Sequence, residues 1–278
     1  MSNKMKLHVS LIVLSTIAFA ESPVKTIIPN EIEEGNHFGR TTVVSGDYIA
    51  ISAPKNDNNG FSSGSVDIFH LVESEWEFVQ TIVPSNPSAF DYFGHSLAMD
   101  DSVLVVGTPG DNENGHKSGS IYVFRNTING WIEEARLLAD DGKSNDSFGE
   151  SVAVLGAQIL VGAYRGSGIT SKTGCAYSFS YDGNEWAQDG KLFADDGYDY
   201  DHFGCSVALS GDWALVGAYK GNDKQGAAYL YYNDGLTLFR SNLGVGVSDR
   251  FTREFKDQKG NSLSSVRNVK FELLNQKK

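Results

Sequence analysis

Residues 148–153, Phe-Gly-Glu-Ser-Val-Ala, and residues 160–164, Leu-Val-Gly-Ala-Tyr, decide the fold of this chain because both stretches recur. The Phe-Gly pair returns every 55 residues, at Phe38-Gly39, Phe93-Gly94, Phe148-Gly149 and Phe203-Gly204. Other landmarks keep the same phase: a small residue lies 15 positions after each Phe, and a Trp lies 38 positions after the first three. Such self-similarity indicates an array of units that bury their apolar faces against one another.

Each unit has the pattern of four short strands. In the third repeat, residues 151–154 and 158–162 flank a tight turn, residues 175–180 follow a loop rich in Gly, Ser and Thr, and an outer strand begins at Trp186. No segment keeps a helical period. The pattern predicts an all-β fold, a β-propeller built from four roughly 55-residue, four-stranded repeats. We expect the Phe to fill the gap between blades, and the Gly to let the backbones approach.

The two ends of the array do not match, which leaves its closure open. Residues 24–29 align with the outer strands of later repeats, whereas the fourth repeat has no outer strand after Tyr232. Pairing of residues 26–28 with residues 227–231 would close a four-bladed ring and remove two exposed edges. In the alternative, the blades form an open arc that is capped by residues 236–239 or by the C-terminal tail.

The first twenty residues predict export. Lys4 and Lys6 precede an apolar run that ends in small residues at Ala20, which is typical of a cleaved signal peptide. We expect a signal peptide (1–20), the repeat array (21–239) and a basic tail (240–278). The tail is a divergent closing element, a disordered segment that docks on acidic blades, or sequence appended where a longer array is interrupted. The protein is expected to be secreted, periplasmic or at the cell surface, with no membrane span.

The repeats resemble a known family. Phe148 to Ala153 with Leu160 to Tyr164, and the matching stretches at 203–208 and 215–219, are similar to the FG-GAP repeat of integrin α-subunit propellers and of many secreted microbial proteins. The resemblance covers about residues 24–232. It implies a propeller that is used for extracellular recognition, but it does not identify a ligand.

One family feature is missing from these repeats. Integrin-type repeats carry an Asp-rich calcium loop between the first two strands, whereas here these turns are only 45–47, 100–102, 155–157 and 210–212. Residues 111–115 have partial calcium-loop spacing but lack the distal Glu, which favours a solvated polar loop. We therefore expect no metal site and no cofactor, beyond weak binding of calcium by acidic loops.

Charge indicates where a partner would bind. Residues 21–239 hold 12 Lys and Arg against 31 Asp and Glu, which argues against nucleic-acid binding. The segments that lead from one blade to the next are acidic and lie on the same edge as the long loops. The candidate ligand-binding residues on this face are Asp140, Asp141, Asp146, Asp195, Asp196, Asp199 and Asp201. They suit a cationic partner, and the alternative is a face that is acidic only for solubility.

Signs of catalysis are few. Residues 60–64, Gly-Phe-Ser-Ser-Gly, match the nucleophile-elbow string of hydrolases, but they lie in a loop between short strands with no following helix, which indicates coincidence. His37 and His202 share one repeat position, which favours a structural role. Cys175 and Cys205 could form a disulfide between the third and fourth blades in an oxidising compartment.

The sequence thus predicts a secreted, non-enzymatic recognition or adhesion module that binds an extracellular protein or glycan through the acidic loops of one propeller face. Two alternatives stay open. One is a hydrolytic enzyme, or an enzyme subunit, on a propeller scaffold. The other is a structural surface protein or an interrupted fragment of a longer propeller.

Overall fold

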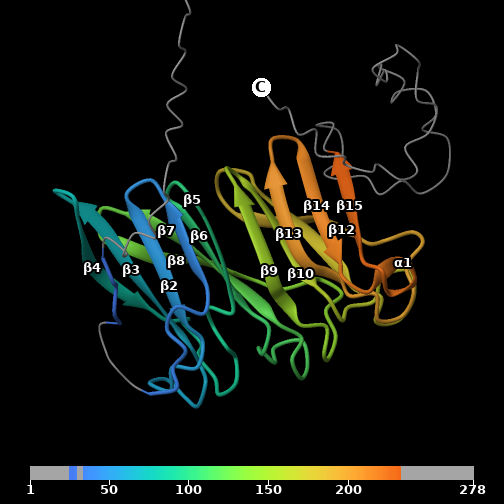
Figure 1. The fold of residues 1–278 in the computed structure, drawn as a ribbon, viewed down its shortest axis with the longest axis horizontal. Coiled ribbons are helices and arrows are strands. Elements are labelled where there is room, and N and C mark those ends of the chain that lie inside the picture. Colours follow the sequence, from blue (N-terminus) through green and yellow to red (C-terminus); the bar gives the residue numbers. More distant parts are fainter. Residues whose placement is uncertain (1–24, 30–33, 233–278) are drawn as a thin grey trace, which may run out of the picture.

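The computed structural model describes residues 25–29 and 34–232. The predicted signal peptide (1–20), residues 236–239 and the predicted basic tail (240–278) lie outside the described residues. In the described part the fold is all-β, and its strands form four antiparallel sheets, one for each repeat (Figure 1). We call these sheets blades 1 to 4, in chain order.

Blades 1 to 3 contain four strands each, paired in chain order, and blade 4 contains three described strands. Blade 1 consists of β1 (Thr42–Ser45), β2 (Tyr48–Ala53), β3 (Ser65–Val72) and β4 (Glu75–Ile82). Blade 2 consists of β5 (Ser96–Asp100), β6 (Val103–Thr108), β7 (Ser120–Thr127) and β8 (Gly130–Leu137). Blade 3 consists of β9 (Phe148–Leu155), β10 (Gln158–Ala163), β11 (Cys175–Tyr181) and β12 (Trp186–Leu192). Blade 4 consists of β13 (Phe203–Ser210), β14 (Trp213–Ala218) and β15 (Ala227–Tyr232), with the single-turn α1 (Gly221–Lys224) in its long loop.

The predicted hairpin of the third repeat is confirmed. β9 and β10 pair antiparallel, with Leu155 opposite Gln158 across a two-residue turn. The register shifts between Gly162 and Ala163, where a bulge brings Phe148 opposite Ala163. Alternating apolar residues form these strands because successive side chains point to opposite faces of a sheet. Each blade therefore has a leading face, turned towards the previous blade, and a trailing face, turned towards the next.

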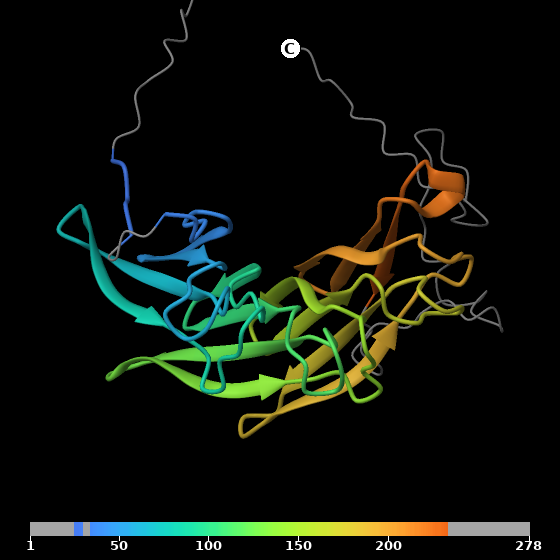
Figure 2. The ribbon, with the colours of Figure 1, turned by 90° about the horizontal axis from the view of Figure 1, so that it is seen from below.

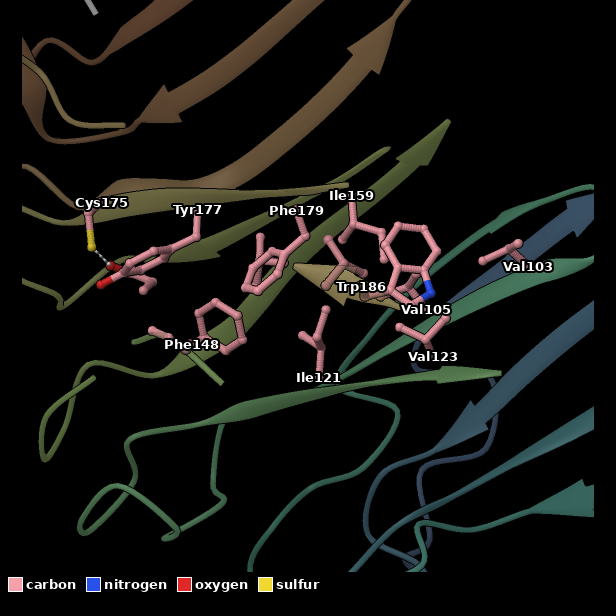
Figure 3. Close-up of a cluster of buried hydrophobic side chains, with 14 residues drawn as sticks. Val103, Val105, Ile121, Val123, Phe148, Ile159, Cys175, Tyr177, Phe179 and Trp186 are labelled. Atoms are coloured by element: carbon pink, nitrogen blue, oxygen red, sulfur yellow. Dashed lines mark hydrogen bonds between the residues drawn. The ribbon is translucent and has the colours of Figure 1, made fainter. Parts of the chain in front are cut away.

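The apolar core lies between the blades. One cluster joins the trailing face of blade 2 to the leading face of blade 3, and Figure 3 shows its members: Val105, Ile121 and Val123 face Phe148, Ile159, Tyr177 and Phe179. Equivalent clusters join blades 1 and 2 and blades 3 and 4. No single blade could bury these side chains alone, which explains why the repeats depend on one another.

The repeated Phe forms the centre of each junction. Phe93, Phe148 and Phe203 are 0%, 1% and 0% exposed. Each ring packs edge-on or tilted against two aromatic rings of its own blade, as Phe148 does against Tyr177 and Phe179. Full burial of such a side chain stabilises the fold by about 1.5–3 kcal/mol. The predicted role of Phe as a plug between blades is thus confirmed for the last three repeats.

The predicted Gly role is confirmed at the same junctions. Gly149, directly after Phe148, lies against the backbone of blade 2, and a Cβ on this Gly would overlap the Ser120 carbonyl oxygen. Gly119, just before β7, also forms a parallel bridge to Phe148, and a Cβ on it would overlap the Phe148 carbonyl oxygen. The hydroxyl of Ser96 donates a hydrogen bond of 2.8 Å to the carbonyl of Gly149 in the next blade. Ser151 repeats this bond to Gly204 at 2.9 Å. Each blade therefore contacts the Phe-Gly pair of the next blade closely, both at its first strand and just before its third strand.

The blades form an open arc, and the four-bladed ring does not form. Blade 1 and blade 4 lie at opposite ends of the molecule (Figures 1 and 2). Lys25 pairs with Glu75 and donates to the carbonyl of Trp76 on β4, so residues 25–29 lie on blade 1 and not on β15. Neighbouring blades lie close together, so the chain turns only a little from one blade to the next. Three such junctions do not bring its two ends together (Figure 2).

The leading face of blade 1 differs from those of the later blades. Phe38 is partly exposed, because among the described residues no blade precedes it. Asp67 takes the position that Tyr122 and Tyr177 hold in the next blades, and it accepts a 2.7 Å hydrogen bond from the Thr81 hydroxyl. A small cavity of about 40 Å³ beside Asp67 is lined by Pro29 and Phe38, among others.

Candidate recognition face

One edge of the arc carries all the long connections. Because each blade is an antiparallel meander, the loops between second and third strands share an edge with the segments that lead into the next blade. In the described residues this loop edge comprises 54–64, 83–95, 109–119, 138–147, 164–174, 193–202 and 219–226. The tight turns, such as 46–47 and 101–102, lie on the opposite edge, which we call the turn edge.

Two of the predicted binding residues hold the loops instead of facing solvent. Asp146 and Asp201 are buried. The Oδ2 of Asp146 accepts a hydrogen bond of 2.9 Å from the Lys143 backbone, and Asp201 accepts one of 2.7 Å from Tyr198. Asp91 closes the same turn in the second repeat, on Ser88 at 2.9 Å. Each carboxylate therefore fixes the segment that leads into its blade.

Two further predicted residues are tied to neighbouring strands. Asp141 accepts a 2.7 Å hydrogen bond from the Tyr177 hydroxyl, and its other oxygen lies 2.6 Å from Lys191 Nζ. Although burial raises it, hydrogen bonds from Lys191 and Tyr177 hold the pKa of Asp141 below its usual value. Asp196 accepts a 2.9 Å hydrogen bond from the Tyr229 hydroxyl. These carboxylates are solvent-accessible but already paired.

The other three predicted residues remain at the surface. Asp140, Asp195 and Asp199 are exposed. Asp199 accepts a 2.7 Å hydrogen bond from Thr170, whereas the carboxylates of Asp140 and Asp195 bond to nothing in the described part of the chain. The loop edge is not uniformly acidic, because exposed basic residues of the long loops interleave with these acids: Lys55, Lys117, Lys143, Arg165, Lys172 and Lys220. A partner would meet a face of mixed charge.

A polar pocket hollows the loop edge at blade 2. Its volume is about 270 Å³. Its walls come from the segment leading into blade 2, from the long loop of blade 2 and from β8, and they consist of Asn86, Ser88, Asp91, Asp111, Asn112, Glu113 and Arg136. Arg136 Nη2 lies 2.6 Å from Asp111, and Nη1 lies 3.2 Å from Glu113. Arg136 therefore pairs with two of the three acids of the pocket, Asp111 and Glu113, and not with Asp91.

The third acid of the polar pocket is incompletely satisfied. Asp91 is 2% exposed, and its Oδ1 has no hydrogen-bond partner within the described residues. Burial, followed by the negative charge of Asp111, raises the pKa of Asp91 to about 6. An entering cation would stabilise the ionised carboxylate, because an opposite charge at close range favours the charged form.

The loop with partial calcium spacing uses its oxygens internally. Asp111 Oδ1 accepts the Glu113 backbone N–H at 2.9 Å, and Asn112 Oδ1 accepts that of Lys117 at 2.9 Å. The Arg136 guanidinium and the Ser120 hydroxyl donate to the remaining lone pairs of Asp111. In the chain as far as the structure describes it, no three His, Cys, Asp or Glu side chains converge to hold a metal ion.

Both cysteines are free thiols, so the disulfide that the sequence permits is not formed in the structure. The two sulfurs point to different strands: Cys175 Sγ lies 3.8 Å from the Ala163 carbonyl, and Cys205 Sγ lies 3.4 Å from that of Gly217. Cys175 faces the core beside Tyr177 (Figure 3), and burial raises the pKa of its thiol to about 12. A thiol in such surroundings is unreactive.

The hydrolase-like string is built into a loop. Ser62 is buried, and its backbone N–H donates a 2.6 Å hydrogen bond to Asp57. The hydroxyl of Ser63 donates to the Asn56 carbonyl at 3.2 Å. β3 begins at Ser65, directly after the string, so the helix that a nucleophile elbow requires does not follow.

The polar pocket was not predicted from the sequence. Arg136 lies on β8, far along the chain from Asp91, and only the folding of the leading segment against the strands of blade 2 brings them together. One signal was available: Asp111 stands where the other repeats have Asn56, Gly166 and Gly221. A charged residue at a position that is otherwise neutral marks the second repeat as different.

A comparison with known families agrees with the repeat period. The family described as FG-GAP repeat matches residues 22–69, 76–124, 131–179 and 186–231. The last three matched units each begin in an outer strand and end in the third strand of the next blade, as 76–124 runs from β4 to β7. None of the helices in the described residues is long and apolar enough to span a membrane. Since the matches cover well over half of its residues, the chain belongs to the FG-GAP repeat family.

Proposed function

We propose that this chain is a non-enzymatic recognition module that acts outside the cytoplasm and binds a basic protein surface through its loop edge. Membership of the FG-GAP repeat family supports a propeller-type module. The signal-peptide pattern of residues 1–20 supports export. The choice of partner rests on the polar pocket, whose wall includes Asp91, a buried acid whose Oδ1 has no hydrogen-bond partner among the described residues.

A Lys or Arg side chain of the partner fits this chemistry. At about 270 Å³ the polar pocket has room for a side chain together with several waters, each of which occupies about 30 Å³ in the liquid. Hydrogen bonds to a charged group contribute about 1.5–3 kcal/mol. Glu113 at the pocket wall and the free carboxylates of Asp140 and Asp195 elsewhere on the loop edge would steer a basic surface towards this edge.

A charge reversal at the pocket tests the proposal. The purified protein is immobilised and offered a panel of extracellular proteins with basic and neutral surfaces, and an array of glycans. We expect binding of basic proteins, at least tenfold weaker for Glu113→Lys and unchanged for the control Glu73→Lys. Glu73 is exposed in the β3–β4 turn, on the turn edge. Binding of glycans alone, or equal effects of the two variants, would contradict the proposal.

A further inference from the structure

The trailing face of blade 4 is apolar and uncovered by any described residue. Leu215 and Leu230 are 43% and 54% exposed, and Trp213 beside them is 37% exposed. Their equivalents in blades 2 and 3 are covered by the next blade: Val105 and Leu160 match Leu215, and Val123 matches Leu230, all at 0%. The face thus has the composition of an inter-blade core with one side missing.

The backbone of this face has the shape of the other junctions. Gly226, before β15, has a φ of 85°, like the 90°, 85° and 92° of Gly64, Gly119 and Gly174. Those three glycines lie against the Phe of the following blade, whereas a Cβ on Gly226 would meet nothing closer than 3.4 Å. Only Gly adopts this φ without strain, and blade 4 keeps it although no Phe of the described residues follows it.

The first two strands of blade 4 also keep the residues that contact the next blade at the other junctions. Ser206 is equivalent to Ser96 and Ser151, whose hydroxyls donate to the Gly carbonyl of the next blade. Gly217 is equivalent to Gly162, whose α-carbon lies against the Gly204 carbonyl of blade 4. In the described residues the Gly217 α-carbon faces only Ser206 and Cys205 of its own blade. The vacant partner at each position is a Phe-Gly pair.

The other end of the arc carries the missing parts. Lys25 donates to the Trp76 carbonyl, just as Gln80 at the end of β4 donates to the Trp131 carbonyl in the next repeat. Residues 25–29 therefore lie on blade 1 where the outer strand of a preceding blade would lie. Phe38 and Gly39, with a φ of 83° at the Gly, follow this segment. Blade 4 lacks a described outer strand, and residues 25–29 pair with no strand of the described residues.

We propose that a second copy of this chain docks head to tail on blade 4. Residues 25–29 of the second copy pair with β15 as its outer strand, and the leading face of its blade 1 covers Leu215 and Leu230. The register follows from blades 1 to 3, in which Val66, Ile121 and Ala176 face Ile82, Leu137 and Leu192. By the same count Ala228 faces Ile27. The contact continues the three junctions already present, with the same Phe-Gly chemistry.

Such a contact is heterologous, so it builds a closed ring where the rotation closes and a chain of copies where it does not. A second copy fits better than a strand alone, because the vacant positions require an outer strand, a Phe-Gly pair and a blade face together. The first matched family unit, 22–69, supplies all three in one stretch.

Light scattering coupled to size-exclusion chromatography over a range of concentrations tests the proposal. We expect the purified protein to reach at least twice the monomer mass. Leu230→Asp should weaken the association at least tenfold, and Phe38→Asp should do the same from the opposite end. Ile128→Asp is the matched control, since Ile128 is fully exposed in the β7–β8 turn and outside both faces.

Mixing separates the proposal from other modes of association. Leu230→Asp disrupts only the blade 4 end, and Phe38→Asp disrupts only the blade 1 end. In a mixture, the intact blade 1 end of the first variant should therefore bind the intact blade 4 end of the second. Circular dichroism checks that each variant is folded. A wild-type protein that stays monomeric at all concentrations would overturn the proposal. So would association that survives both substitutions, or folded variants that fail to pair when mixed.

Discussion

The same Phe has different surroundings in the first repeat and in the later ones. Phe148 is buried between Tyr177 and Phe179 and the trailing face of blade 2, whereas no blade precedes Phe38 in the part of the chain that the structure describes. Phe148→Ala should lower the free energy of unfolding by roughly 3–5 kcal/mol through lost burial and a cavity. Phe38→Ala should cost about 1 kcal/mol. Chemical denaturation measures both, at a protein concentration too low for association. Equal losses would mean that the inter-blade contacts do not stabilise the fold.

Asp91 gives the stability of the protein a defined pH dependence. Its folded pKa, about 6, lies above the usual 3.8, so the folded state keeps a proton that the unfolded chain has lost. Stability therefore falls as the pH rises from about 4 to about 6, and the loss persists above that range. Asp91→Asn removes the charge and copies Asn36 of the first repeat.

The expected result is a variant that gains stability relative to wild type as the pH rises from about 4 to about 7. Urea denaturation at several pH values measures the difference in unfolding free energy, and Asp146, whose pKa burial also raises, is unchanged in both proteins. A difference that stays constant with pH would show that Asp91 keeps its ordinary pKa.

The glycines that precede the third strands allow backbone strain to be separated from steric overlap with the next blade. Gly119 and Gly226 share a φ of 85°, so Ala at either position has the same backbone strain, about 1–2 kcal/mol. Only at Gly119 would the new Cβ overlap the carbonyl of Phe148. Gly119→Ala should therefore destabilise the monomer by about 2 kcal/mol more than Gly226→Ala. Thermal or urea denaturation measures this, and similar losses would contradict the junction geometry.

Most of the strands and hairpins can be predicted from the sequence, because the residue pattern within each repeat determines where its strands lie. The Phe-Gly landmarks and the alternation in residues 151–154 predicted the hairpins and the inter-blade Phe. The burial of Asp146 and the pairing of Asp141 with Tyr177 could not be predicted, since they depend on how a loop folds against the neighbouring strand. Ring closure depends on the angle at each junction, which the spacing of landmarks does not encode.

At the scale of the whole molecule, the short turns predict little dependence on calcium. Several acids of the loop edge bond to neighbouring protein groups, as Asp199 does to Thr170 and Asp141 to Tyr177 and Lys191, and among the described residues no three converge as a calcium cage requires. Millimolar calcium, compared with chelator, should raise the melting temperature by less than about 10 °C. A larger shift in a thermal scan would reveal a calcium site that these oxygens form together.

We propose that the loop edge, and not the turn edge, binds the partner. The direct test compares two triple variants with equal loss of charge: Asp140→Asn with Asp195→Asn and Asp199→Asn on the loop edge, and Asp47→Asn with Asp101→Asn and Asp212→Asn on the turn edge. All six residues are exposed. Affinity for a basic protein identified in the binding panel is measured at low and high salt. We predict that the loop-edge variant binds at least tenfold more weakly and loses most of the salt dependence, while the turn-edge variant binds as wild type does. Equal binding by the two variants, or a loss confined to the turn-edge variant, would contradict the account.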